Sequence, residues 1–228
     1  MKLGVLTGLQ FEAQLIHHIF ENSKSPIIRC SGANKSSAKG AAQELINMGC
    51  DRLLSFGVAG GLSSDLEIGE LVIGTSVIRE SDGAVFQVDP NWCNAIHSQL
   101  SSNLHVSKKK CVGVNEPVSL VSKKNQLAEQ FDASFVDMES HILASAATTA
   151  GLPFAVLRAV SDTGDMPIPR WVFDGIKENG TIDYVTLIWH GFSHIGDWPH
   201  LLKLQYGKYR ACSQLKKAIH YLEISLMV

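Results

Sequence analysis

Short apolar runs alternate with segments of helical spacing along most of this chain. Several of the runs are apolar at consecutive positions, which is typical of strands in a sheet that is covered on both faces. Strands that alternate with amphipathic helices indicate parallel crossover units. We therefore expect an α/β fold with a mixed, mostly parallel central sheet flanked by helices. The predicted strands are 3–7, 27–30, 52–56, 71–77, 111–114, 134–137 and 154–160, and the predicted helices are 11–20, 36–48, 91–101, 123–131 and 140–150.

The pattern changes after Asp165. Two prolines within residues 166–169 interrupt regular structure, and a helical tail rich in leucine and aromatic residues follows the turn at Asn179 and Gly180. We expect residues 1–165 to form the α/β core and residues 166–228 to form a C-terminal helical extension of the same domain. Such a tail either packs on the domain or closes a homo-oligomer, or it forms an apolar surface with basic edges that admits a lipid substrate.

The composition and net charge of the chain exclude some classes of function. The chain has 228 residues, of which 45% are hydrophobic and 18% charged, and this suits one compact domain. A net charge of -2 provides no basic stripe for nucleic acid, so we expect no nucleic-acid partner. The 5 cysteines lack metal-ligand spacing and are expected to be reduced thiols. With no signal-peptide core or long apolar window, we expect a cytoplasmic protein, with peripheral membrane contact through the tail as a further expectation.

Acidic residues stand at the ends of two predicted strands. Asp137 and Glu139 follow one strand, Asp162 ends another, and Glu12 comes soon after the first strand. In α/β sheets the carboxyl ends of parallel strands gather side chains around one ligand. Carboxylates from these three places in the sequence, gathered around one pocket, favour bond cleavage through a cationic transition state.

Each of these signals also has a structural explanation. Acids in a first helical turn are stabilised by the helix dipole without any ligand. The glycine-rich segment 57–61 either makes a tight turn or lets backbone amides approach a ligand oxygen, and the segment 30–35 has the same two interpretations. A sequence that contains the glycine segment, then Asp-Met-Glu and then Ser-Asp, in this order, is much rarer than a sequence that contains any one of these motifs.

Taken together, the motifs resemble the purine nucleoside phosphorylase and nucleosidase superfamily over residues 1–165. Residues 56–62, Phe-Gly-Val-Ala-Gly-Gly-Leu, resemble its glycine segment, Val136 to Glu139 its ribose-binding Glu-Met-Glu, and Arg158 to Asp162 its Ser-Asp motif. The chain looks similar to the methylthioadenosine and S-adenosylhomocysteine nucleosidases. It looks closer still to the hopanoid-associated phosphorylases, which release adenine from adenosylhopane, because residues 136–141, residues 151–158 and an extended tail occur together in that branch.

The resemblance implies a role for each motif. Asp162 would protonate the purine at N7, Glu139 would bind ribose hydroxyls, and Met138 would pack against the sugar. Glu12 stands where the nucleosidases keep the acid that activates water. The other residues that we expect around the substrate are Asp137, Ser161, Gly57, Val58, Ala59, Gly60 and Val118.

Departures from the family pattern favour water over phosphate as the nucleophile. Phosphorolysing relatives place arginines before the glycine segment and after the first strand, where this chain has Ser55 and the stretch 10–12. A carboxylate at Glu12 repels phosphate, so phosphate as a co-substrate is not favoured and we expect neither a cofactor nor a metal. Val118 falls where the nucleosidases stack a phenylalanine on the base. Phe135 is a candidate substitute, but a core position is the favoured interpretation of this residue.

The sequence thus predicts an enzyme that cleaves the N-glycosidic bond of a 5'-modified adenosine and releases adenine. The favoured substrate is adenosylhopane, which makes the expected partner a small nucleoside, either free or lipid-linked, and we expect a homo-oligomer. The alternatives are a methylthioadenosine or S-adenosylhomocysteine nucleosidase, another purine nucleoside phosphorylase, and a catalytically inactive nucleoside-binding protein.

Overall fold

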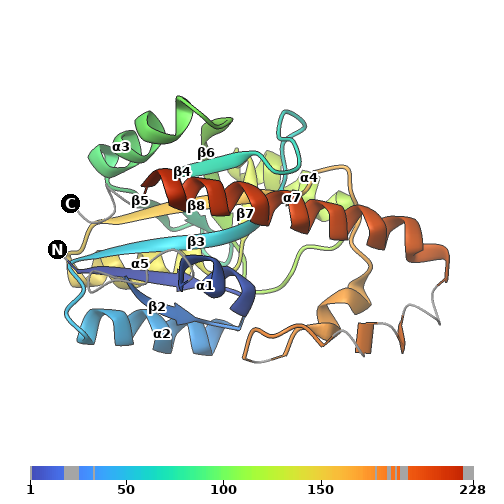
Figure 1. Cartoon of the computed structure of the whole chain (residues 1–228), viewed down its shortest axis with the longest axis horizontal. Helices are drawn as coiled ribbons and strands as arrows, with labels where there is room; N and C mark the ends of the chain where they lie inside the picture. Colours follow the sequence, from blue (N-terminus) through green and yellow to red (C-terminus); the bar gives the residue numbers. More distant parts are fainter. Residues whose placement is uncertain are drawn as a thin grey trace.

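The computed structural model describes residues 2–17, 26–32, 34–177, 179–183, 186–187, 189–190 and 195–222. In this part of the chain the strands form one eight-stranded sheet in the order β2-β1-β3-β7-β6-β4-β5, with β8 paired to both β3 and β4 (Figure 1). The strands are β1 (Leu3–Thr7), β2 (Ile27–Cys30), β3 (Arg52–Gly61), β4 (Leu71–Arg79), β5 (Val85–Gln87), β6 (Val106–Gly113), β7 (Phe135–Asp137) and β8 (Phe154–Asp162).

The double pairing of β8 closes part of the sheet into a ring. β3, β7, β6, β4 and β8 each pair with the next, and β8 returns to β3. The β1–β2, β1–β3, β3–β8, β4–β6 and β6–β7 pairs are parallel, whereas β3–β7, β4–β5 and β4–β8 are antiparallel. The predicted mixed, mostly parallel sheet flanked by helices is therefore confirmed.

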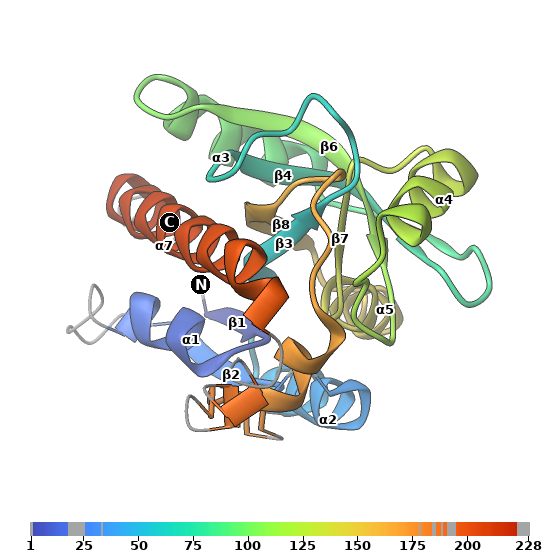
Figure 2. The same cartoon turned by 90° about the vertical axis from the view of Figure 1, so that its right-hand side faces the viewer.

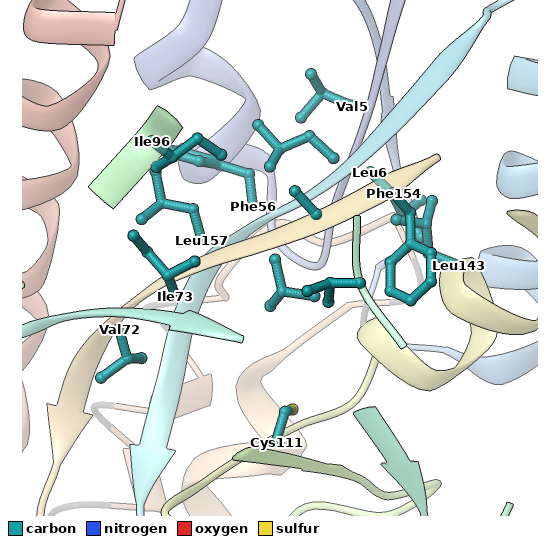
Figure 3. Packing of buried hydrophobic residues seen from close by; sticks show 14 of the residues in the cluster. Val5, Leu6, Phe56, Val72, Ile73, Ile96, Cys111, Leu143, Phe154 and Leu157 are labelled. Atoms are coloured by element: carbon teal, nitrogen blue, oxygen red, sulfur yellow. The ribbon is translucent and has the colours of Figure 1, made fainter. Parts of the chain in front are cut away.

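Helices cover the sheet on both sides. Figure 2 shows α7 and α5 on opposite sides of β3 and β8, with α1 and α3 beside α7 and α2 beside α5. Side chains such as Phe56, Leu157 and Leu143 fill the core between these layers (Figure 3). The helices are α1 (Gln10–His17), α2 (Lys35–Asn47), α3 (Pro90–Ser101), α4 (Val121–Phe131), α5 (Ser140–Ala150) and α7 (Trp198–Leu222).

Two strands run further than the sequence pattern indicates. β3 continues through the glycine segment to Gly61, because β8 pairs with it as far as Gly60. β6 begins at Val106 rather than at residue 111, and its three consecutive lysines alternate between exposed and partly buried positions, as in a strand with one face toward solvent. β5 was not predicted, since three residues give too short a pattern.

The C-terminal helix α7 packs closely on β8. Its buried residues are mostly small or aliphatic, and they belong to the main core: Ala211, Leu215, Ala218, Ile219 and Leu222. A Cβ added at Gly207 would overlap the carbonyl oxygen of Ser161, so glycine permits this approach. Among the described helices, none is both long and apolar enough to cross a membrane.

The residues between Asp162 and α7 are less regular than the predicted tail. Two short 3-10 helices lie there, at Arg170–Gly175 and Ile195–Asp197. Within the predicted extension, residues 178, 184, 185, 188, 191–194 and 223–228 lie outside the described residues. All 5 cysteines are free thiols, as expected from their spacing.

Candidate active site

Arg158 lies at the centre of a buried group of charges. It is in the middle of β8 and its side chain is 0% exposed. Its Nε lies 2.8 Å from Oδ2 of Asp137, and its Nη2 lies 3.3 Å from Oε2 of Glu139 and donates to the Ser55 hydroxyl at 2.7 Å. Burial opposes the charge on Arg158, and the surrounding carboxylates outweigh that effect and raise its pKa. The guanidinium thus stays charged and fixes two acids on neighbouring elements.

Asp137 is buried beside Arg158 and does not reach an open surface. Its Oδ1 accepts from the Ser140 amide at 3.0 Å, and its Oδ2 accepts from the Ser140 hydroxyl and faces Arg158. The side chain is 1% exposed. These contacts favour a supporting role for Asp137, in which it starts α5 and orients Arg158, over the direct substrate contact expected from sequence.

Glu12 is fixed by backbone amides. Its Oε1 accepts from Val58 N at 2.8 Å, and its Oε2 accepts from the amides of Gly8 and Leu9, each at 2.9 Å. Gly57 has a φ of 151°, and a Cβ there would collide with the Glu12 carboxylate. Burial raises the pKa of Glu12, although the charge of Arg158 and the three amides act in the opposite direction. The result is a fixed carboxylate with a raised affinity for a proton.

Glu139 occupies the N-cap position of α5, but its side chain does not cap the helix. Its Oε1 lies 3.5 Å from the Ser31 hydroxyl, and a Cβ added at Gly8 would lie 2.6 Å from that same oxygen. Burial raises the pKa of Glu139 to about 7, with further increases from Asp137 and Glu12 and an opposing effect of Arg158. Glu139 therefore changes its charge near neutral pH.

The raised pKa of Glu139 predicts a loss of stability as the pH rises. Between about 4.5 and about 7 the folded protein holds a proton on Glu139 that the unfolded chain has released, so the free energy of unfolding falls across this range. The contribution is on the order of 1–3 kcal/mol. Urea unfolding at pH 5 and pH 8 should show a smaller fall for Glu139→Gln than for the wild type. The control is Glu44→Gln, at an exposed glutamate; identical pH dependence in all three proteins would contradict the prediction.

The second half of the site is built around Asp162, at the end of β8. The β3–β8 register shifts here, since Ala59 pairs with Val160 but Gly60 pairs with Asp162. Such a bulge re-aims the side chains that follow it. Asp162 lies against Gly60, where an added Cβ would be 3.2 Å from Oδ2.

Both oxygens of Asp162 have partners within the protein. Oδ2 accepts from Lys124 Nζ at 2.5 Å, and Oδ1 accepts from the Ser161 hydroxyl at 2.6 Å. That hydroxyl also lies 3.2 Å from the carbonyl oxygen of Ala59. The carboxylate plane of Asp162 is therefore fixed before any ligand binds.

Apolar side chains border the Asp162 end of the site. Val118 and Met138 pack together in a small core cluster that includes Leu127 of α4 and Val136 of β7. Phe135 is 0% exposed within the main core, so the suggestion that it stacks on a purine is wrong. Of the predicted substrate residues in this cluster, Val118 provides an aliphatic group and Met138 a thioether.

The two halves of the site share one strand segment. Glu12 and Arg158 lie against Gly57 and Asp162 lies against Gly60, which is about 10 Å further along β3. Val136, three residues before Glu139, also pairs with Gly60. In the part of the chain that is described, no group of three or more potential ligands has the geometry of a metal site. This arrangement suits acid–base chemistry on a small, elongated ligand.

Two charged residues of this site received no role from sequence. Arg158 stands inside an otherwise apolar strand, and Lys124 shares a helical face with Leu127 and Phe131 at i+3 and i+7. A charged residue on a buried face needs a partner, because an unpaired buried charge is very costly. A charged residue at a position that the pattern predicts to be buried was therefore the feature of the sequence that could have identified Arg158 and Lys124.

Comparison with known proteins shows to which family the chain belongs. Residues 6–180 match the family model described as the phosphorylase superfamily. The chain belongs to this superfamily. It is 26% identical to an aminodeoxyfutalosine nucleosidase of Helicobacter pylori over 70% of this chain and 79% of the relative. It is also 26% identical to a 5'-methylthioadenosine/S-adenosylhomocysteine nucleosidase of Actinobacillus succinogenes over 72% of this chain and 87% of the relative.

Solved structures of the superfamily share the fold over nearly the whole chain. Futalosine hydrolase of Helicobacter pylori has a TM-score of 0.75 at 17% identity, covering 98% of this chain and 97% of that one. A Neisseria meningitidis 5'-methylthioadenosine/S-adenosylhomocysteine nucleosidase in complex with methylthio-immucillin-A has a TM-score of 0.75 at 18% identity, covering 98% and 99%. This member of the phosphorylase superfamily is therefore an enzyme that cleaves glycosyl bonds.

Proposed function

We propose that this enzyme hydrolyses the N-glycosidic bond of a 5'-modified adenosine and releases adenine. The observation that carries the proposal is the environment of Glu12, a buried carboxylate held by three backbone amides and backed by Arg158. Phosphate needs unneutralised cationic donors, and here Arg158 is already engaged by Asp137 and Glu139. Water is the nucleophile that fits a carboxylate in this position.

The proposed mechanism gives one task to each acid. Glu12 takes a proton from the attacking water, and its raised pKa suits a general base near neutral pH. Glu139 accepts hydrogen bonds from ribose hydroxyls, while Met138 packs against the sugar. Asp162 passes a proton to N7 of the purine, so that the electrons of the broken C1'–N9 bond are accommodated on a neutral leaving group. The carboxylates also stabilise the oxocarbenium-like transition state.

For the 5' substituent we favour an apolar, lipid-like group such as the hopane of adenosylhopane. Trp198, Leu202, Tyr206 and Tyr209 are exposed along α7 at spacings that place them on one side of the helix, with exposed Lys203 and Arg210 on the same helix. An apolar stripe with basic neighbours suits contact with a lipid surface.

The helix that carries this stripe packs next to the site through its opposite, buried face. Gly207, next to Tyr206, lies against the carbonyl of Ser161, which directly precedes Asp162. The names of the curated relatives favour a second candidate, a smaller 5' substituent such as that of methylthioadenosine or aminodeoxyfutalosine.

A panel of adenosine derivatives tests the reaction and the substrate together. We expect adenine release, measured by chromatography, to proceed without inorganic phosphate and to be unchanged by added phosphate. In H2(18)O the label should appear in the sugar product. Adenosylhopane in mixed micelles should give a higher kcat/KM than methylthioadenosine, S-adenosylhomocysteine or aminodeoxyfutalosine.

The same assay separates the alternatives. Glu12→Gln should lower kcat by about 100-fold or more, because the general base is lost, whereas Glu129→Gln on the exposed side of α4 should have no effect. A rate that rises with phosphate concentration would reject hydrolysis. A higher kcat/KM for one of the small substrates would reject the lipid-like substituent, and nucleoside binding without adenine release would indicate a binding protein.

A further inference from the structure

Lys124 is a buried lysine next to the proposed general acid. It lies in the first turn of α4, its side chain is 0% exposed, and it shares the inward face of that helix with Leu127. An ammonium group that is removed from water destabilises the protein by several kcal/mol unless it is paired and hydrogen-bonded. The position of Lys124 therefore requires strong partners.

Three acceptors surround the Lys124 nitrogen. Nζ donates to Oδ2 of Asp162 at 2.5 Å, to the carbonyl oxygen of Thr163 at 2.7 Å and to that of Met166 at 3.0 Å. An ammonium has three N–H donors, whereas a neutral amine has only two and a lone pair. The three acceptors thus match the charged form, and two of them hold Nζ in place whether or not a substrate is bound.

The Lys124 ammonium forms a buried ion pair with the Asp162 carboxylate. A cation in contact with a carboxylate favours its ionised form. An ionised Asp162 has no proton for a departing purine, although the function proposed above requires one at N7. The nearest proton within this contact is the one on Lys124 Nζ.

We propose that Lys124 is a positioning residue that provides, through Asp162, the proton for the departing purine. As the C1'–N9 bond breaks, its electron pair moves onto the purine ring. One proton leaves Nζ, passes through the Asp162 carboxylate and ends on N7, so that Lys124 becomes a neutral amine and Asp162 remains a carboxylate. Water adds to C1' and gives its own proton to Glu12, which balances the proton transferred to N7; solvent exchange then restores both groups. This inference rests on the proposed function.

A purely structural role for Lys124 makes a different prediction. The same contacts fasten the segment 163–166 behind the site, and loss of that fastening would disturb every substrate alike. Loss of a proton source affects only substrates whose leaving group needs a proton. A 4-nitrophenyl riboside does not need one, since 4-nitrophenolate leaves as a stable anion.

The test compares Lys124→Met with Lys123→Met on two substrates that carry the same 5' substituent, the adenine nucleoside and the 4-nitrophenyl riboside. Lys123 is the adjacent lysine on α4, and it is partly exposed and paired with Glu80. We expect Lys124→Met to lower kcat for adenine release by about 100-fold or more with little change in KM, and to lower nitrophenolate release only a few-fold. Lys123→Met should match the wild type on both substrates.

Several outcomes would overturn the proposal. Equal losses on the two substrates would assign Lys124 a structural role only, and unchanged adenine release would assign it no role in the reaction. If Lys124→Met does not fold, the same two-substrate comparison is made with Lys124→Gln. The glutamine amide still donates to the backbone carbonyls but carries no charge. A wild type that releases adenine, combined with equal or absent losses in Lys124→Met, would overturn the proton path alone, whereas a wild type that releases nitrophenolate but no adenine would reject adenine release and the proton path together. A wild type inactive on both substrates would reject the proposed function and the proton path with it.

Discussion

Replacing Asp162 by asparagine is expected to abolish adenine release while the protein still folds. The amide has nearly the same shape and can still accept from Lys124, but it cannot transfer a proton to the purine. Loss of a general acid lowers the rate by about 100- to 10,000-fold. Steady-state adenine release measures the effect, and circular dichroism together with the melting temperature reports on folding.

The matched control for this variant is Asp165→Asn, three residues further along the chain. Asp165 is exposed and its carboxylate accepts from the Thr163 hydroxyl, so the same change there removes a charge without touching the site. Asp165→Asn should retain the wild-type rate. If Asp162→Asn were also active at that rate, Asp162 would have no part in protonating the leaving group.

The alternation of apolar runs was sufficient to predict most of the sheet and its helices. Local signals also marked the end of α5 correctly, since Gly151 is the C-cap residue of this helix and adopts a φ of 67°. The same pattern failed in the glycine segment, where a turn was the natural expectation. There the strand continues because β8 supplies a long pairing partner, and the glycines are needed because carboxylates occupy the space of their side chains.

The charge network could not be predicted from the sequence alone. Arg158 pairs with Asp137 because β7 and β8 both border β3, and only the tertiary arrangement establishes that proximity. The partnership of Lys124 and Asp162 likewise joins α4 to the end of β8 across 38 residues of chain. The order of the motifs in the sequence indicated which acids share a site. Only the tertiary packing shows which cations pair with those acids.

The composition of the C-terminal tail did not indicate which of its residues are buried. Its large aromatic residues were the natural candidates for burial, yet Trp198, Tyr206 and Tyr209 are exposed and the buried face is small or aliphatic. The reason is the close approach of α7 to β8 at Gly207, which leaves no room for a bulky side chain. Exposure of the aromatic face is therefore a consequence of how tightly the helix packs.

Replacing Arg158 by methionine is expected to cause the largest loss of stability of any single change in this site. Methionine fills much of the same volume but leaves Asp137, Glu139 and Glu12 as buried acids without their shared cation. Removing one partner from a buried ion pair destabilises a protein by about 3–5 kcal/mol. Urea unfolding at pH 7 measures this loss. The loss should shrink on acidification, because protonation of Glu12 and Glu139, whose pKa values burial raises, removes their repulsion.

A comparison of variants distinguishes buried charge from lost packing in that result. Arg29→Met removes a partly exposed arginine that is paired with Glu44 and should change the free energy of unfolding by less than about 1 kcal/mol. Combining Arg158→Met with Asp137→Asn and Glu139→Gln should recover part of the lost stability, since those changes neutralise two of the three abandoned acids. If the triple variant were no more stable than Arg158→Met alone, the packing of the arginine side chain, and not its charge, would be what stabilises the centre of this site.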